Sequence, residues 1–162
     1  MSRQSLSIEQ RESRAKNAVA AFLFRQLIVP KVFFDARWPG RGTAVDVLAL
    51  DRSGTGDIHV AEVKAVSGSQ AISRTVAALK KIPAHFKYLA LFDNEDYRPD
   101  EQLLYSADGL GRIGILRVTE DDRGNLSADF RIRPERFRVD PAFFKLVDKF
   151  TAGRTADMEV RP

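Results

Sequence analysis

The chain has 162 residues, of which 44% are hydrophobic and 30% charged, and it carries a net charge of +4. This length suits one domain with a sizeable core, so we predict a single domain over residues 1–150 and a flexible tail over 151–162. The absence of cysteine excludes disulfides and thiolate metal sites, and no apolar run has membrane-spanning length, so we expect a cytoplasmic protein with no membrane partner.

Positive charge is concentrated in the first half of the chain. Residues 1–81 contain 13 Lys/Arg and 7 Asp/Glu, whereas residues 82–162 contain 13 and 15. Such a surplus suits a polyanionic partner such as DNA, although a surplus of this size is also common on proteins that bind no nucleic acid.

Helices and strands alternate along the chain. Ser7 and Gln10 form a capping-box pattern at the start of a helix predicted over residues 7–29, which Pro30 ends. Strands are expected at 31–37, 44–51 and 58–66, followed by a helix at 69–82 and a strand at 87–92. A helix at 99–107, strands at 112–118 and 126–132, and a helix at 140–150 complete the prediction. Together they indicate an α/β sandwich with a mixed sheet.

A glycine-rich segment at residues 109–114 matches the G-x-G-x-x-G pattern of dinucleotide-binding proteins. That fingerprint requires a strand before the glycines and a helix after them. Here a predicted helix precedes the segment and a predicted strand follows it. We therefore interpret it as a helix end and a turn rather than a cofactor site.

Three charged residues interrupt the apolar second and third strands. Asp46 lies within the second strand, and Glu62 and Lys64 lie within the third, across a polar turn typical of a hairpin. Glu62 and Lys64 are two residues apart, so they point to the same face, and the hairpin register brings Asp46 close to Glu62. Charges among apolar neighbours are costly unless they are paired or bind a metal.

Two converging carboxylates form a hard-oxygen site suited to Mg²⁺, or to Mn²⁺ as a substitute. With the carbonyl of Val63 as a third ligand, the predicted metal ligands are Asp46, Glu62 and Val63. Lys64 beside the ion would orient or deprotonate a water, or stabilise the transition state of phosphodiester hydrolysis. The alternative is a structural cluster of ion pairs on a solvated face, but apolar residues such as Leu48 share that face.

Asp46 followed by Glu62-Val63-Lys64 resembles the PD-(D/E)xK nuclease superfamily, which has the restriction-endonuclease-like fold. The core of that family is a helix, three strands, a helix and a strand, similar to the order predicted over residues 7–92. The resemblance implies a Mg²⁺-dependent deoxyribonuclease acting in repair, recombination or restriction. In it Asp46 and Glu62 hold the ion and Lys64 serves the attacking water.

The resemblance also implies supporting catalytic roles for Glu12 and Gln70. Glu12 lies on the apolar stripe of the first helix and matches a glutamate that many members carry there. Its alternative is an ordinary ion pair with Lys16, one turn later. Gln70 matches a glutamine early in the following helix. The sequence departs from the family at Val45, where a proline is frequent, and at Arg74, where exonuclease members often have tyrosine. We expect an endonuclease rather than an exonuclease.

Four residues are candidates for contact with the nucleic acid: Arg37, Trp38, Arg41 and Arg74. Trp38 suits base stacking and a core position equally well. No zinc finger or clear helix-turn-helix is present, so structural preference or a partner protein would choose the target, and a homodimer stays open. The rival function is a catalytically inactive module of the same fold that binds DNA or a protein.

Overall fold

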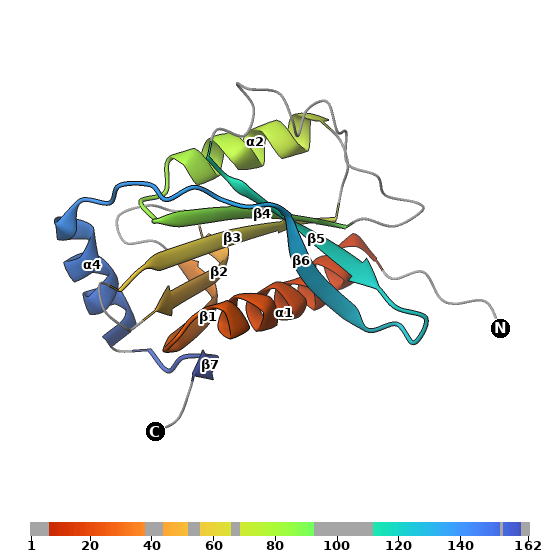
Figure 1. Cartoon of the computed structure of the whole chain (residues 1–162), viewed down its shortest axis with the longest axis horizontal. Coiled ribbons are helices and arrows are strands. Elements are labelled where there is room, and N and C mark those ends of the chain that lie inside the picture. The colour runs from red at the N-terminus through yellow and green to blue at the C-terminus, as the bar shows by residue number, and fades with distance from the viewer. Residues whose placement is uncertain are drawn as a thin grey trace.

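The computed structural model describes residues 7–37, 44–51, 56–65, 69–92, 112–152 and 154–159. The helices of this part of the chain are α1 (Ile8–Gln26), α2 (Ser69–Lys80) and α4 (Pro141–Ala152). The strands are β1 (Pro30–Arg37), β2 (Ala44–Asp51), β3 (Ile58–Lys64), β4 (Phe86–Phe92), β5 (Gly114–Glu120), β6 (Leu126–Ile132) and β7 (Met158–Glu159). They form one mixed sheet with helices on both faces (Figure 1), so the predicted α/β class with a mixed sheet is confirmed.

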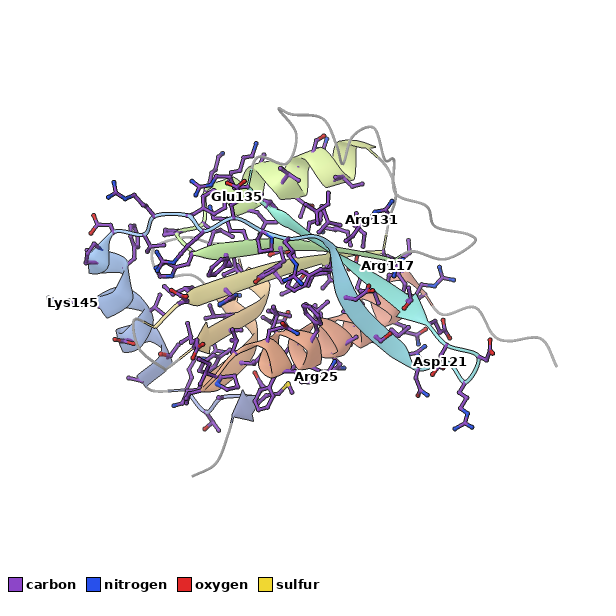
Figure 2. The ribbon with its side chains drawn as sticks, in the orientation of Figure 1. Arg25, Arg117, Asp121, Arg131, Glu135 and Lys145 are labelled. Carbon is purple, nitrogen blue, oxygen red and sulfur yellow. The ribbon has the colours of Figure 1, made fainter. Side chains whose placement is uncertain are left out.

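The strands follow the order β6-β5-β4-β3-β2-β1-β7 across the sheet. β1, β2 and β3 pair antiparallel with their chain neighbours, whereas β3, β4 and β5 pair parallel, because α2 carries the chain back between β3 and β4. β5 and β6 form an antiparallel hairpin. Figure 2 shows Asp121 at the tip of that hairpin, where its carboxylate accepts hydrogen bonds from the N–H groups of Arg123 and Asn125.

Two apolar clusters cover the opposite faces of the sheet. On one face, which we call the α1 face, α1 packs a stripe that includes Ala15 and Val19. On the other, the α2 face, α2 contributes Ile72 and Leu79 and α4 contributes Val147. None of the helices within the described ranges is long and apolar enough to cross a membrane.

Helix α1 begins as predicted and ends earlier than predicted. The Ser7 hydroxyl accepts a hydrogen bond from the Gln10 N–H at 3.1 Å, and the Gln10 side chain accepts one from the Ser7 N–H at 3.0 Å, which confirms the capping box. The expected end was residue 29. Instead, the N–H groups of Ile28 and Val29 donate to the carboxylate of Asp51, at 3.3 and 3.1 Å, so the chain leaves the helix before it enters β1.

The last residues of the chain also differ from the expectation. Thr151 and Ala152 still belong to α4, and β7 pairs with β1. Asp157 anchors this pairing: its N–H donates to the Val32 carbonyl, and its carboxylate accepts from the Phe34 N–H, both at 2.8 Å. Part of the segment expected as a tail therefore belongs to the sheet. The helix predicted at 99–107 lies outside the described residues.

Candidate active site

Strands β2 and β3 separate at the residues that the sequence singles out. Their antiparallel ladder ends at the pair Val47 and Ala61. The next pair in the same register would be Asp46 and Glu62, but β3 continues to Lys64 along β4. Among the described residues, no strand pairs with the β2-facing edge of β3 beyond Ala61, and we call this open stretch the fork.

Two carboxylates bind the backbone at the open edge of β3. Asp46 Oδ2 accepts a hydrogen bond from the Val63 N–H at 2.8 Å, and Glu12 Oε1 accepts one from the Ala65 N–H at 3.3 Å. Ala65 directly follows β3 and packs on the same face as Val63, so the alternation of the strand continues and these two N–H groups point the same way. The Val63 carbonyl, in an extended residue, points to this edge as well.

The side chains of Glu62 and Asp46 interact through their charges and through a hydrogen bond. Burial, the negative charge of Asp46 and a hydrogen bond between the two side chains raise the pKa of Glu62 from 4.5 to about 8, and the Lys64 ammonium opposes this rise. Two carboxyl groups in such proximity cannot both ionise without a compensating charge. The pair therefore presents the electrostatic condition that favours a bound cation.

The site extends across both faces of the sheet. Glu62 and Lys64 alternate with the residues of the α1 face and so share the α2 face with Val60, as the sequence predicts. Glu12 approaches from α1, on the opposite face. In the part of the chain that is described, no three acidic or histidine side chains are grouped closely enough to hold an ion. The structure thus brings Asp46 and Glu62 together and places Glu12 further along the same edge.

Lys16 also belongs to this site, although the sequence pattern does not single it out. Its ammonium lies 2.7 Å from Asp35 Oδ1 and 3.5 Å from Asp46 Oδ1. Partial burial acts to lower the pKa of Lys16, but the hydrogen bond to Asp35 and the charges of both carboxylates outweigh it, so the pKa lies above its ordinary value. These ion pairs join α1 to the strands, rather than Lys16 to Glu12 within the helix.

Asp35 reaches Lys16 because β1 is irregular at this residue. Its φ of 50° lies in the left-handed region, which aspartate tolerates better than most residues with a side chain. Phe34 before it packs on the α1 face and Ala36 after it on the α2 face, so the alternation of faces skips one position. The β1–β2 register pairs Phe34 with Val47 and Ala36 with Val45, and it skips Asp35 and Asp46 between them. Both acids therefore occupy the point where the two strands are distorted.

The remaining predicted site residues are placed only in part. Arg37 is the exposed last residue of β1, at the same end of the sheet as the fork. Arg74 is exposed on α2, one turn after Gln70. Gln70 lies in the first turn of α2, and its side chain is outside the described part of the structure. Trp38 and Arg41 fall outside the described residues.

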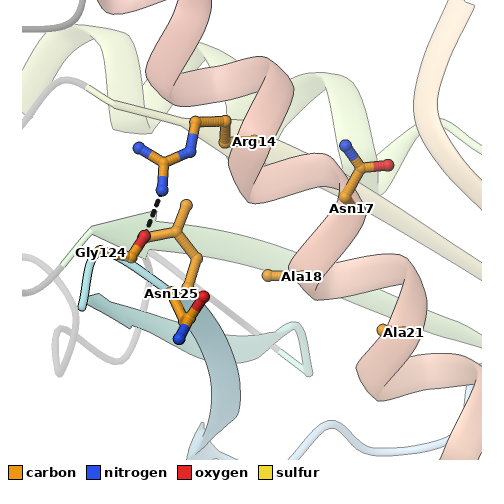
Figure 3. Close-up of a pocket in the computed structure, with 7 residues that line it drawn as sticks. Arg14, Asn17, Ala18, Ala21, Gly124 and Asn125 are labelled. Atoms are coloured by element: carbon orange, nitrogen blue, oxygen red, sulfur yellow. Dashed lines mark hydrogen bonds between the residues drawn. The ribbon is translucent and has the colours of Figure 1, made fainter. Parts of the chain in front are cut away.

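A separate groove lies on the far side of α1 (Figure 3). This cavity of about 370 Å³ is lined by Arg14, Asn17, Ala18 and Ala21 of α1 and by Gly124, Asn125 and Leu126 of the β5–β6 hairpin. The Arg14 guanidinium donates a hydrogen bond to the Gly124 carbonyl, which ties the helix to the hairpin. Because an α-helix has about 3.6 residues per turn, these α1 residues point away from Glu12 and Lys16.

A comparison of the chain with models of known protein families finds no match. A comparison with curated proteins finds none either. Function is therefore inferred from the residues of the fork and their geometry.

Proposed function

We propose that the chain is a divalent-metal-dependent nuclease of the PD-(D/E)xK type, which hydrolyses phosphodiester bonds of DNA. The observation that carries the proposal is the fork, where Asp46 and Glu62 converge beside Val63 and Lys64. The order α1-β1-β2-β3-α2-β4 adds support, because it is the order that the family resemblance implies.

The donor atoms at the fork fit Mg²⁺ or Mn²⁺. Two carboxylates, from Asp46 and Glu62, and the carbonyl of Val63 are hard oxygen ligands of the kind that these ions prefer. A cation between the carboxylates would relieve the repulsion that helps to raise the pKa of Glu62. A bound ion would supply Lewis-acid polarisation of a phosphoryl oxygen.

The remaining tasks belong to side chains of the protein. Lys64 shares a face with Glu62, so its ammonium would hold the attacking water and stabilise the charge that develops as the water oxygen bonds to phosphorus and the leaving oxygen departs. Glu12 would fix the end of β3 through Ala65, and Gln70 would support the site from α2. Arg37, at the same end of the sheet, would bind the DNA backbone.

The proposal is tested by cleavage of single-stranded, duplex and branched DNA with Mg²⁺ or Mn²⁺. We expect Asp46→Asn, Glu62→Gln and Lys64→Met each to lose activity by about 100-fold or more, because each removes a charge that acts on the transition state. Asp129→Asn is the matched control, because this exposed acid pairs with Arg117 on the β5–β6 hairpin. Equal activity of wild type and Asp46→Asn on every substrate would contradict the proposal.

The form of the substrate separates the two kinds of nuclease. A covalently closed circular DNA has no ends, so an endonuclease cuts it and an exonuclease does not. We expect the closed circle to be nicked or linearised, and an RNA of the same sequence tests the preference for DNA.

A second candidate function is supported by the hydrogen bonds at the fork. Asp46 and Glu12 already bind backbone N–H groups, and Lys16 already pairs with Asp46, so the cluster is satisfied in part without an ion. A binding module of this fold would keep the cluster as a structural element. Calorimetry with Mn²⁺ distinguishes the two: an active site binds the ion and loses it in Glu62→Gln, whereas a structural cluster binds none.

A further inference from the structure

We propose that Lys16 is a built-in counter-ion of the metal site, which neutralises Asp46 in the metal-free protein and is retained by Asp35 when a divalent cation takes its place. This inference rests on the proposed function. It adds two residues to the site, one from α1 and one from β1, and gives both a role in metal affinity.

The two oxygens of Asp46 have different partners. Oδ2 accepts the hydrogen bond from the Val63 N–H at 2.8 Å, and this bond fixes the carboxylate at the open edge of β3. Oδ1 faces the ammonium of Lys16 at 3.5 Å. The lysine charge thus approaches the Asp46 oxygen that is not held by the backbone. A divalent cation that uses this oxygen would have to displace that charge or tolerate it at close range.

The two partners of Lys16 are also unequal. Its distance to Asp35 Oδ1 is 2.7 Å, shorter than the 3.5 Å to Asp46 Oδ1. The Asp35 side chain is 64% exposed, whereas that of Asp46 is 21% exposed. Lys16 is therefore tethered mainly to the outer carboxylate. Release of its weaker contact with Asp46 would leave the ammonium paired and close to solvent, so no buried charge is left unmatched.

The left-handed backbone of Asp35 in β1 makes its ion pair with Lys16 possible. In a regular strand the side chains of Phe34 and Asp35 would point to opposite faces. Phe34 packs on the α1 face, yet Asp35 also reaches Lys16 of α1, because of its left-handed backbone. The distortion thus places a carboxylate beside the ammonium that a regular strand would direct away from it.

The test is calorimetric titration of metal-free protein with Mn²⁺. We expect Lys16→Met to bind Mn²⁺ about 5-fold more tightly than wild type, because the competing positive charge is gone. Asp35→Asn should bind it several-fold more weakly, because Lys16 then keeps Asp46 as its remaining charged partner. Lys145→Met, a change at an exposed lysine on α4, is the matched control and should bind like wild type.

The double variant Lys16→Met/Asp35→Asn should bind Mn²⁺ as tightly as Lys16→Met, because Asp35 acts through the lysine. Weaker or unchanged binding in Lys16→Met, with wild-type binding intact and sensitive to Glu62→Gln, overturns this inference and leaves the proposed function standing. Absence of Mn²⁺ binding in wild type overturns both. Far-UV circular dichroism checks that each variant folds. If Lys16→Met does not fold, Lys16→Gln takes its place. In that case, unchanged Mn²⁺ binding in Asp35→Asn is sufficient to refute the inference.

Discussion

Asp46 serves the fold and the candidate chemistry with the same carboxylate. One oxygen satisfies the Val63 N–H, which has lost its strand partner at the fork, and the negative charge of the group acts on Glu62. A buried N–H without a partner is costly, and so is a second negative charge beside a half-buried acid. The two contributions have opposite effects on stability, so they can be separated by substitution.

The variants Asp46→Asn and Asp46→Ala separate the contribution of the hydrogen bond to Val63 from that of the negative charge. Asn keeps an oxygen for the Val63 N–H and removes the charge, so we expect a free energy of unfolding close to or above that of wild type. Ala leaves the N–H without its acceptor, so we expect a loss of about 1–3 kcal/mol. Urea unfolding in metal-free buffer measures both values. Equal losses in the two variants would show that the hydrogen bond contributes nothing.

At the scale of single residues, the sequence reveals what breaks a pattern. Asp46, Glu62 and Lys64 are visible because charges stand among apolar strand residues. Lys16 is not, because a lysine on a helix is ordinary. Asp35 is also a charged residue within an apolar strand, as Asp46 is. Its ion pair with Lys16, however, depends on a left-handed backbone torsion angle, which cannot be predicted from composition or residue spacing.

At the scale of elements, the β5–β6 hairpin explains one glycine of the G-x-G-x-x-G segment. Gly114 is the first residue of β5, so the segment leads into a strand, as the sequence predicts. A Cβ atom built at Gly114 would lie 2.8 Å from Pro134 Cδ and 2.9 Å from Pro134 N. The glycine is therefore required by the close approach of the chain that follows β6, which is a packing role rather than a phosphate-binding one.

We accordingly expect Gly114→Ala to lower the free energy of unfolding by about 1–3 kcal/mol, because the added methyl group forces backbone or ring atoms apart. Urea denaturation monitored by circular dichroism would show this as a lower midpoint with an unchanged slope. Ser127→Ala on the exposed side of β6 is a suitable comparison. A midpoint like that of wild type would mean that Pro134 can move aside at little cost.

The fork itself marks the limit of what element-level patterns predict. The strands and their hairpin follow from apolar runs and a polar turn, and the ladder ends at Val47 and Ala61, one position before Asp46 and Glu62 would pair. The separation of the strands does not follow from these runs. The separation of β2 from β3 occurs beside the distortion at Asp35 of β1. It therefore depends on the neighbouring strand, and so on tertiary structure.

At the scale of the whole molecule, the buried His59 and the half-buried Glu62 make opposite contributions to the pH dependence of stability. Burial lowers the pKa of His59 from 6.5 to about 4, and burial with the charge of Asp46 raises the pKa of Glu62 from 4.5 to about 8. As the pH falls below 6.5, His59 takes up a proton in the unfolded chain first, which destabilises the fold. Between about 8 and 6.5, Glu62 takes up a proton in the folded chain first, which stabilises it.

We therefore expect metal-free protein to gain about 1–2 kcal/mol of stability as the pH is lowered from 8 to 6.5. Below pH 6.5 the two contributions oppose each other and the gain should level off. Glu62→Gln should show no such rise, because the titrating group is gone. Urea unfolding at half-unit intervals of pH tests this, and a rise that persists in Glu62→Gln would assign it to another group.

The architecture as a whole was more predictable than the site. The mixed sheet follows from local periodicity, and helices on both faces follow from the need to cover two apolar surfaces. β7 could not be predicted in this way, because Met158 and Glu159 are too short and too polar a segment to show the periodicity of a strand. Its place on β1 depends on the hydrogen bonds of Asp157, which connect segments far apart in the chain.

The order of the strands has a kinetic consequence. β1, β2 and β3 are neighbours both in the chain and in the sheet, and only residues 38–43 and 52–57 separate them, whereas residues 93–113 separate β4 from β5. The entropy lost on closing a loop grows with its length, and contacts between distant segments slow folding. All the charged groups of the fork lie between Glu12 and Lys64. The two loops that join the strands of the fork are thus shorter than the segment that joins β4 to β5, so less entropy is lost when they close.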